Sequence, residues 1–287
     1  MYFSLAKLFS EPPDFWLSMG FCMVCAACIF LWVARLPSKN LATTSEDWNI
    51  PQLSWLDQLL PLALCFLGVF LVQTVLGLLN KGLQLEKLEY QILGTYTLQG
   101  TLIGMLIFLR IKFPKMYGSP LNKVHAQTPW QASVHALFTF LKYLPLIWLA
   151  TALSQWFFQY FGAQLEQQKP VEMLLNALEK EPIKFWALAF GAILMAPIAE
   201  ELLFRSYIYR FLKSKYTTLA ATLISALLFA AMHANLASLI PLFVLGVLFT
   251  RSYENTGSIV TPMVYHALFN AHSILLISLT PYFPELQ

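Results

Sequence analysis

Charged residues are scarce in this sequence. Only 11% of the residues are Asp, Glu, Lys or Arg, whereas a soluble globular protein carries about 25%. Hydrophobic residues make up 58% of the chain. Too few charged side chains are present to cover the surface of a soluble fold of this length. The composition therefore excludes a soluble globular protein and predicts a polytopic membrane protein.

Clusters of basic residues are also missing. The formal net charge is only +3, and no run of Lys and Arg alternates with aromatic residues. Proteins that bind nucleic acid usually concentrate basic side chains on one face. We therefore expect no nucleic-acid partner, and the lipid bilayer is the medium that the composition indicates.

Cysteine is rare, and it forms no disulfide framework. Cys22, Cys25 and Cys28 lie in the first apolar stretch of the chain, and Cys65 lies in the second. Their spacing of three residues suggests a metal site, but thiols within a lipid-embedded helix are more often packing residues. We expect neither a metal site nor a disulfide from them.

Apolar stretches long enough to cross a bilayer recur along the chain. A membrane-spanning helix needs about 20 apolar residues. The sequence predicts eight such spans, at about residues 15–34, 55–79, 91–111, 133–161, 183–212, 217–235, 236–253 and 258–281. Acidic residues rather than a basic segment precede the first span, so we expect it to be retained and not cleaved as a signal peptide. The predicted fold is an all-α, multi-pass integral membrane protein, which we expect in the cell inner membrane.

A short amphipathic segment separates the fourth span from the fifth. Within residues 170–182, apolar side chains recur at helical spacing, and acidic and basic ones occupy the other side. Pro170 suits the first turn of a helix, and Pro182 suits its end. Such a helix lies on the membrane surface, and we interpret it as a structural cover rather than a substrate gate. The predicted domains are residues 1–165 with spans one to four, a connector at 166–182, and a catalytic core at 183–287.

The fifth predicted span contains three charged residues, Glu200, Glu201 and Arg205. Charges inside a bilayer are costly and are normally paired or face an internal cavity. Glu201 and Arg205 are one helical turn apart, with the acid on the favourable N-terminal side. Glu200 has no such partner. Because a poorly hydrated carboxylate is a stronger base than one in water, Glu200 is the candidate general base.

Three more polar residues lie within predicted spans: His233 in the sixth, and His266 and Asn270 on one face of the eighth. Each has a structural explanation on its own, because membrane helices also use such residues to hydrogen-bond one another. Together with Glu200 they predict a polar cavity inside the bundle. Pro197 removes a backbone N–H just before Glu200 and is expected to bend the fifth span around that cavity.

These residues form three motifs that resemble those of a known protein family. The motifs are Glu200-Glu201-x-x-x-Arg205, Phe229-x-x-x-His233 and His266-x-x-x-Asn270. In order and spacing they are similar to the motifs of the CPBP intramembrane proteases, which include type II CAAX prenyl endopeptidases and bacteriocin-immunity-type proteins. The resemblance covers about residues 183–280 and does not extend to the first 165 residues.

The resemblance implies a peptidase that cuts within or next to the membrane. It implies that Glu200 activates water with the help of His233, and that His266 and Asn270 stabilise the oxyanion. Glu201 and Arg205 would then maintain the geometry of the helix. The implied substrate is a membrane-associated peptide or protein. Substrates with a prenylated CAAX terminus belong to this class.

Cofactor use has two alternatives. The resemblance implies a mechanism that depends on glutamate and uses no metal. The other alternative is a catalytic zinc with Glu200, His233 and His266 as its three protein ligands. The sequence contains no His-Glu-x-x-His motif, and we therefore favour the metal-free alternative.

Two other functions are compatible with the same residues. The first is a non-enzymatic membrane immunity or peptide-binding protein that uses the cavity for binding. The second is a transporter, because intramembrane acids and histidines also form proton relays. Transporters often contain inverted repeats, and the sequence shows none. A complete set of base, assisting histidine and oxyanion donors favours catalysis over binding.

Overall fold

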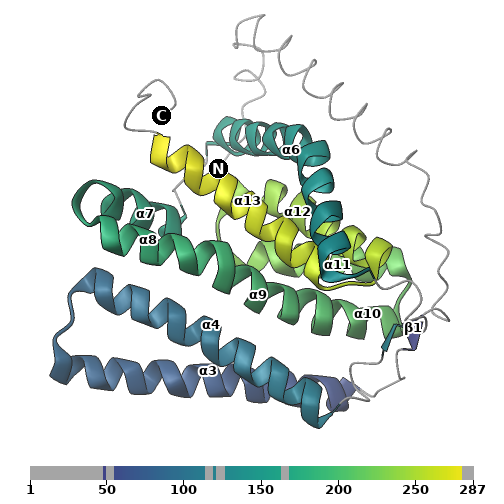
Figure 1. Cartoon of the computed structure of the whole chain (residues 1–287), viewed down its shortest axis with the longest axis horizontal. Coiled ribbons are helices and arrows are strands. Elements are labelled where there is room, and N and C mark those ends of the chain that lie inside the picture. The colour runs from purple at the N-terminus through teal and green to yellow at the C-terminus, as the bar shows by residue number, and fades with distance from the viewer. Residues whose placement is uncertain (1–47, 50–54, 114–118, 121–126, 163–167, 280–287) are drawn as a thin grey trace, which may run out of the picture.

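We describe a computed structural model of the chain, shown in Figure 1. It describes residues 48–49, 55–113, 119–120, 127–162 and 168–279. Outside the helices, the described part of the chain has two strands, β1 (Trp48–Asn49) and β2 (Ser119–Pro120), which pair antiparallel. The all-α class predicted from the sequence is confirmed. The predicted first span and three of the four cysteines lie outside the described residues, while Cys65 is buried with a free thiol.

Among the described residues, six helical stretches are long and apolar enough to cross a membrane. They are α3 (Trp55–Leu83), α4 (Lys87–Lys112), α6 (Pro129–Tyr160), the stretch Pro182–Lys215, α12 (Leu236–Thr256) and α13 (Val260–Leu279). In place of the predicted sixth span lies the shorter apolar helix α11 (Thr218–Met232). The chain is therefore a multi-pass integral membrane protein.

The fifth predicted span is one continuous helical stretch with two π-helical segments. In chain order its parts are α8 (Pro182–Phe190), η1 (Gly191–Met195), α9 (Ala196–Glu201), η2 (Leu202–Tyr209) and α10 (Arg210–Lys215). π-Helical turns are wider than α-helical ones and are frequent at functional sites. Here they flank α9, the short segment that carries both glutamates.

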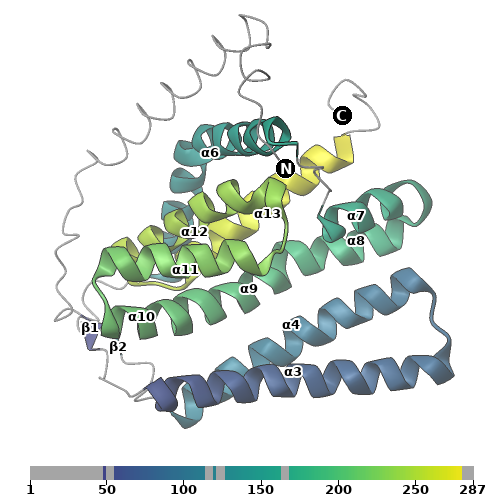
Figure 2. The ribbon, with the colours of Figure 1, turned by 180° about the vertical axis from the view of Figure 1, so that it is seen from behind.

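The long stretch α8–α10 lies in the middle of the molecule. In both views, α3 and α4 lie on one side of it, and α6, α11, α12 and α13 lie on the other (Figures 1 and 2). The largest buried cluster includes Phe204 of η2, Phe229 of α11, Phe249 of α12 and Tyr265 of α13. The centre of the core therefore surrounds the C-terminal half of this stretch, where the charged residues lie.

The short amphipathic helix is present as α7 (Lys169–Lys180). Its Leu174 and Ala177 are buried in a cluster with Phe185 and Leu188 of α8 and Ile274 of α13. The two helices pack closely because Pro182 begins α8 two residues after α7 ends. The predicted helix is thus confirmed, and its apolar side is covered by α8 and α13.

A glycine allows α11 and α12 to approach each other closely. A Cβ atom added at Gly246 of α12 would lie 2.9 Å from the Cα of Ala226 and 3.2 Å from its carbonyl oxygen. Backbone atoms cannot move aside as the end of a flexible side chain can. Only glycine therefore fits at this crossing without displacing one of the two helices.

Gly246→Ala should destabilise the protein, because overpacking a tight contact typically costs about 1–3 kcal/mol. Thermal unfolding in detergent would measure the effect. Gly104→Ala in α4 is the matched control, since nothing lies within 4 Å of the added Cβ there. Equal unfolding temperatures for Gly246→Ala and the parent protein would contradict the close crossing.

Candidate active site

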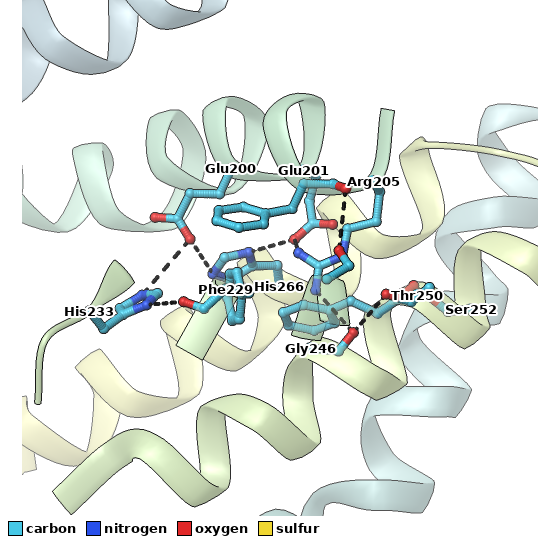
Figure 3. Close-up of polar contacts among 12 residues, drawn as sticks. Glu200, Glu201, Arg205, Phe229, His233, Gly246, Thr250, Ser252 and His266 are labelled. Carbon is cyan, nitrogen blue, oxygen red and sulfur yellow. Dashed lines mark hydrogen bonds and ion pairs between the residues drawn. The ribbon is translucent and has the colours of Figure 1, made fainter. Parts of the chain in front are cut away.

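Three helical segments bring their polar residues to one point in the core. Glu200 lies near the end of α9, His233 directly follows α11, and His266 lies in α13. The Oε2 atom of Glu200 is 3.9 Å from Nε2 of His233 and 4.0 Å from Nε2 of His266. Figure 3 shows both imidazole rings facing this carboxylate. Three of the four polar residues that the sequence placed in one cavity therefore meet in the structure, and the fourth, Asn270, contacts the backbone of η1 instead.

A gap separates the Glu200 carboxylate from the two imidazoles. Its Oε2 atom is buried and has no hydrogen-bond partner among the described residues. The two distances are too long for direct hydrogen bonds, and a polar contact of that length commonly contains a water molecule. The side chains of Glu200 and His233 are 28% and 25% exposed, but that of His266 is only 6% exposed. The site is therefore accessible from the side of Glu200 and His233.

The Glu201 carboxylate links His266 to Arg205. Its Oε1 atom accepts a hydrogen bond from Nη1 of Arg205 at 2.9 Å, and it lies 3.1 Å from Nδ1 of His266. A carboxylate paired with arginine only accepts, so Nδ1 of His266 carries a proton. In the neutral ring, Nε2 then has the lone pair, and Nε2 is the atom that faces Glu200. The sequence predicts the Glu201–Arg205 pair but gives no sign of the contact with His266.

The backbone of α11 fixes the ring of His233. Its Nδ1 atom lies 2.8 Å from the carbonyl oxygen of Phe229, one turn earlier. Because a carbonyl only accepts, Nδ1 carries the proton and Nε2 faces Glu200. The next residue, Ala234, has a left-handed backbone with a φ of 48°, and the Asn235 side chain caps α12. This turn ends α11 at the site rather than beyond it.

Arg205 is fully buried among aromatic rings. Its guanidinium carbon lies 4.6 Å from the ring centre of Phe229 and 5.1 Å from that of Phe249. Its Nη2 atom donates to the carbonyl oxygen of Gly246 at 3.0 Å. The same two rings pack against His266. An aromatic wall therefore excludes water from the inner half of the site and strengthens its ionic contacts.

Asn270 contacts the backbone of the fifth span. Its Nδ2 atom donates to the carbonyl oxygen of Ala192, in η1, at 2.8 Å. A side-chain amide has a second N–H, which this bond leaves available. The neighbouring His272 lies outside the site, and its Nε2 accepts from the indole N–H of Trp148 at 3.3 Å.

The Glu200 carboxylate and the Nε2 atoms of His233 and His266 meet at one point of the core. General acid–base catalysis needs a side chain that can accept or give a proton within reach of the reacting group. The arrangement therefore contains the groups that such catalysis requires.

The side chains do not fit a zinc site as they lie. Within the described part of the chain, no three His, Cys, Asp or Glu side chains are grouped so that they could hold a metal ion. Ligand atoms about 2.1 Å from a tetrahedral zinc are about 3.4 Å apart. The Glu200 oxygen is farther than this from both imidazole nitrogens, at 3.9 and 4.0 Å.

Removing either partner of the Glu201–Arg205 pair should destabilise the protein. Both side chains are 0% exposed, and a buried charge that loses its partner typically costs about 3–5 kcal/mol. Glu201→Ala and Arg205→Ala should therefore each unfold at a lower temperature than the parent in detergent.

Lys184→Ala is the control for this prediction. Lys184 pairs with three acidic side chains that are 37%, 44% and 72% exposed, and exposed pairs contribute about 0–1 kcal/mol each. If the Glu201 and Arg205 variants are as stable as the parent but inactive, the pair acts in the reaction and not in the fold.

The chain resembles a curated protein over part of its length. Over 116 residues it is 27% identical to the "Putative membrane peptidase YdiL" of Bacillus subtilis (strain 168). The matched part makes up 40% of this chain and 46% of that protein, so the chain spans less than half of its relative. No solved structure matches the chain.

A family model matches the part of the chain that contains the site. Residues 182–272 match the model described as "Type II CAAX prenyl endopeptidase Rce1-like". This segment runs from the start of α8 into α13 and includes every residue of the three motifs. The match confirms, for residues 182–272, the resemblance to type II CAAX prenyl endopeptidases that the three motifs indicate.

Proposed function

We propose that this chain is an intramembrane endopeptidase that hydrolyses a peptide bond of a membrane-associated substrate. The observation that carries the proposal is the convergence of the Glu200 carboxylate with two imidazole Nε2 atoms, at 3.9 and 4.0 Å. The family match of residues 182–272 and the name of the bacterial relative support the same class of reaction.

Glu200 acts as the general base in this proposal. A water between Glu200 and His233 gives a proton to the carboxylate while its oxygen attacks the carbonyl carbon of the substrate. The C–N bond then breaks, and the proton held by Glu200 passes to the leaving nitrogen, with His233 assisting the transfer. The water is consumed, and the carboxylate returns to its starting state.

His266 and Asn270 stabilise the negative oxygen that forms during the attack. In this proposal His266 donates an Nε2–H to the oxyanion, while Glu201 holds the opposite nitrogen of the ring at 3.1 Å. The second N–H of Asn270 is the other donor. Donors held in place before the reaction are effective because they need no reorganisation when the charge appears.

The proposed reaction uses neither a metal nor another cofactor. The substrate is a membrane-associated peptide or protein, for which a prenylated CAAX terminus is the class named by the matching family model. A peptide-binding protein without activity does not need two imidazole nitrogens directed at a carboxylate. The geometry of the site does not favour the non-enzymatic, peptide-binding alternative.

Glu200→Gln should lower peptidase activity by about 10²-fold or more, because the amide keeps the shape of the side chain but cannot accept the proton. The assay compares a prenylated peptide with an unmodified peptide of the same sequence. Glu172→Gln on the exposed side of α7 makes the same substitution outside the site and should retain activity. Activity near that of the parent in Glu200→Gln would refute the assignment of the base.

The metal-free mechanism predicts little zinc in the purified protein. Elemental analysis should find much less than one zinc per chain, and activity should survive long incubation with a strong chelator. A different result would show that zinc takes part in the reaction: one zinc per chain, with activity that is lost when a chelator removes the zinc and that returns when zinc is added back.

A further inference from the structure

The carbonyl of Ala192 lies at a break in the backbone hydrogen bonding of the fifth span. In an α-helix it would accept from the N–H of Ala196, four residues later. That N–H donates instead to Gly191, five residues earlier. The next residue, Pro197, has no N–H to give. Neither an α-helical nor a π-helical donor is therefore available to this carbonyl.

Asn270 supplies the missing donor from another helix. Its Nδ2 atom lies 2.8 Å from the Ala192 oxygen, a normal length for a hydrogen bond. An unsatisfied carbonyl in a membrane interior costs several kcal/mol, so this bond matters more here than it would at a protein surface. Asn270 lies one helical turn after His266 on α13, and both side chains contact the fifth span.

The π-helical segment determines which way Glu200 points. One extra residue in a helical turn rotates everything that follows by about 100°. The helix before the segment is held by α4, because the hydroxyl of Tyr96 donates to the carbonyl of Ala187 at 2.8 Å. The ring of Tyr96 also stacks on Phe190. With α8 held in this way, the direction of Glu200 depends on whether the wide turn at Gly191–Met195 persists.

On the basis of the proposed function, we propose that Asn270 is a positioning residue for Glu200. Its bond to the Ala192 carbonyl maintains η1, and η1 directs the general base towards His233 and His266. This role uses one N–H of the amide and is separate from the donation of the other N–H to the oxyanion. Asn270 thus replaces the backbone donor that Pro197 removes.

Hydrogen exchange tests the bond without reference to activity. Asn270→Ala should speed exchange of the backbone amides in residues 186–200 by at least about fivefold to tenfold, because one hydrogen bond gives that ratio in water and a larger one in a membrane interior. Ser273→Ala is the matched control on α13, because its hydroxyl donates to Phe269 within the same helix. Unchanged exchange in this segment of Asn270→Ala would overturn the proposal.

A second substitution should suppress the effect of the first. Pro197→Ala restores a backbone N–H near the Ala192 carbonyl, so the Asn270 bond becomes redundant. In that background, Asn270→Ala should change the exchange by less than about twofold, as expected when two changes act on one interaction. If Asn270→Ala alone does not fold, the double variant should fold. An equal loss in both backgrounds would overturn the proposal.

Peptide hydrolysis by the same proteins separates this inference from the proposed function. A positioning role predicts that Pro197→Ala partly restores the kcat lost in Asn270→Ala, with little change in KM. No recovery of kcat would mean that the oxyanion role accounts for the whole loss, and it would overturn the proposal. If the parent protein hydrolyses no peptide but the exchange pattern holds, the proposed function fails and the Asn270 bond to η1 stands.

Discussion

The site depends on one buried carboxylate, that of Glu201. It accepts from Arg205 in its own helical stretch and contacts His266 in α13. Arg205 in turn donates to the carbonyl of Gly246 in α12. A single negative charge thus connects three helices and fixes the tautomer of the histidine. A membrane interior makes each of these bonds harder to replace, because no water is present to compensate for a lost partner.

Two adjacent glutamates can have different roles because a helix turns by about 100° per residue. Glu201 points into the core and is fully buried, whereas Glu200 points to the accessible side and is 28% exposed. The aromatic rings of Phe229 and Phe249 pack on Arg205, the ionic partner of the inner group. Position on the helix therefore gives one acid a fixed ionic partner and leaves the other acid on the accessible side of the site.

Features that depend on one helix were predictable from the sequence. The lengths of the apolar stretches predict the spans, the four-residue spacing predicts the Glu201–Arg205 pair, and the periodicity of residues 170–182 predicts α7. Contacts between helices were not predictable, because periodicity does not give the relative rotation and height of two spans. The Glu201–His266 and Asn270–Ala192 contacts belong to this class.

Other differences arise from the backbone itself. Pro197 predicted a bend, but hydropathy contains no information that distinguishes a kink from the π-helical turns that are present. The predicted sixth span was expected to continue to Asn235. It ends at Met232 because the side chain of His233 bonds the last turn and Ala234 adopts a left-handed backbone. Local side-chain chemistry, and not hydrophobicity, determines where this helix stops.

The early end of α11 has a consequence for the surrounding lipid. This helix has 15 residues, which corresponds to about 23 Å at 1.5 Å per residue. The hydrocarbon core of a bilayer is about 30 Å thick, and lipids next to a short apolar helix adapt by thinning. His233 directly follows this helix, so a bilayer that thins to match α11 brings its polar interface closer to the accessible edge of the site. The water that a hydrolytic reaction consumes would then cross less hydrocarbon on its way to the site.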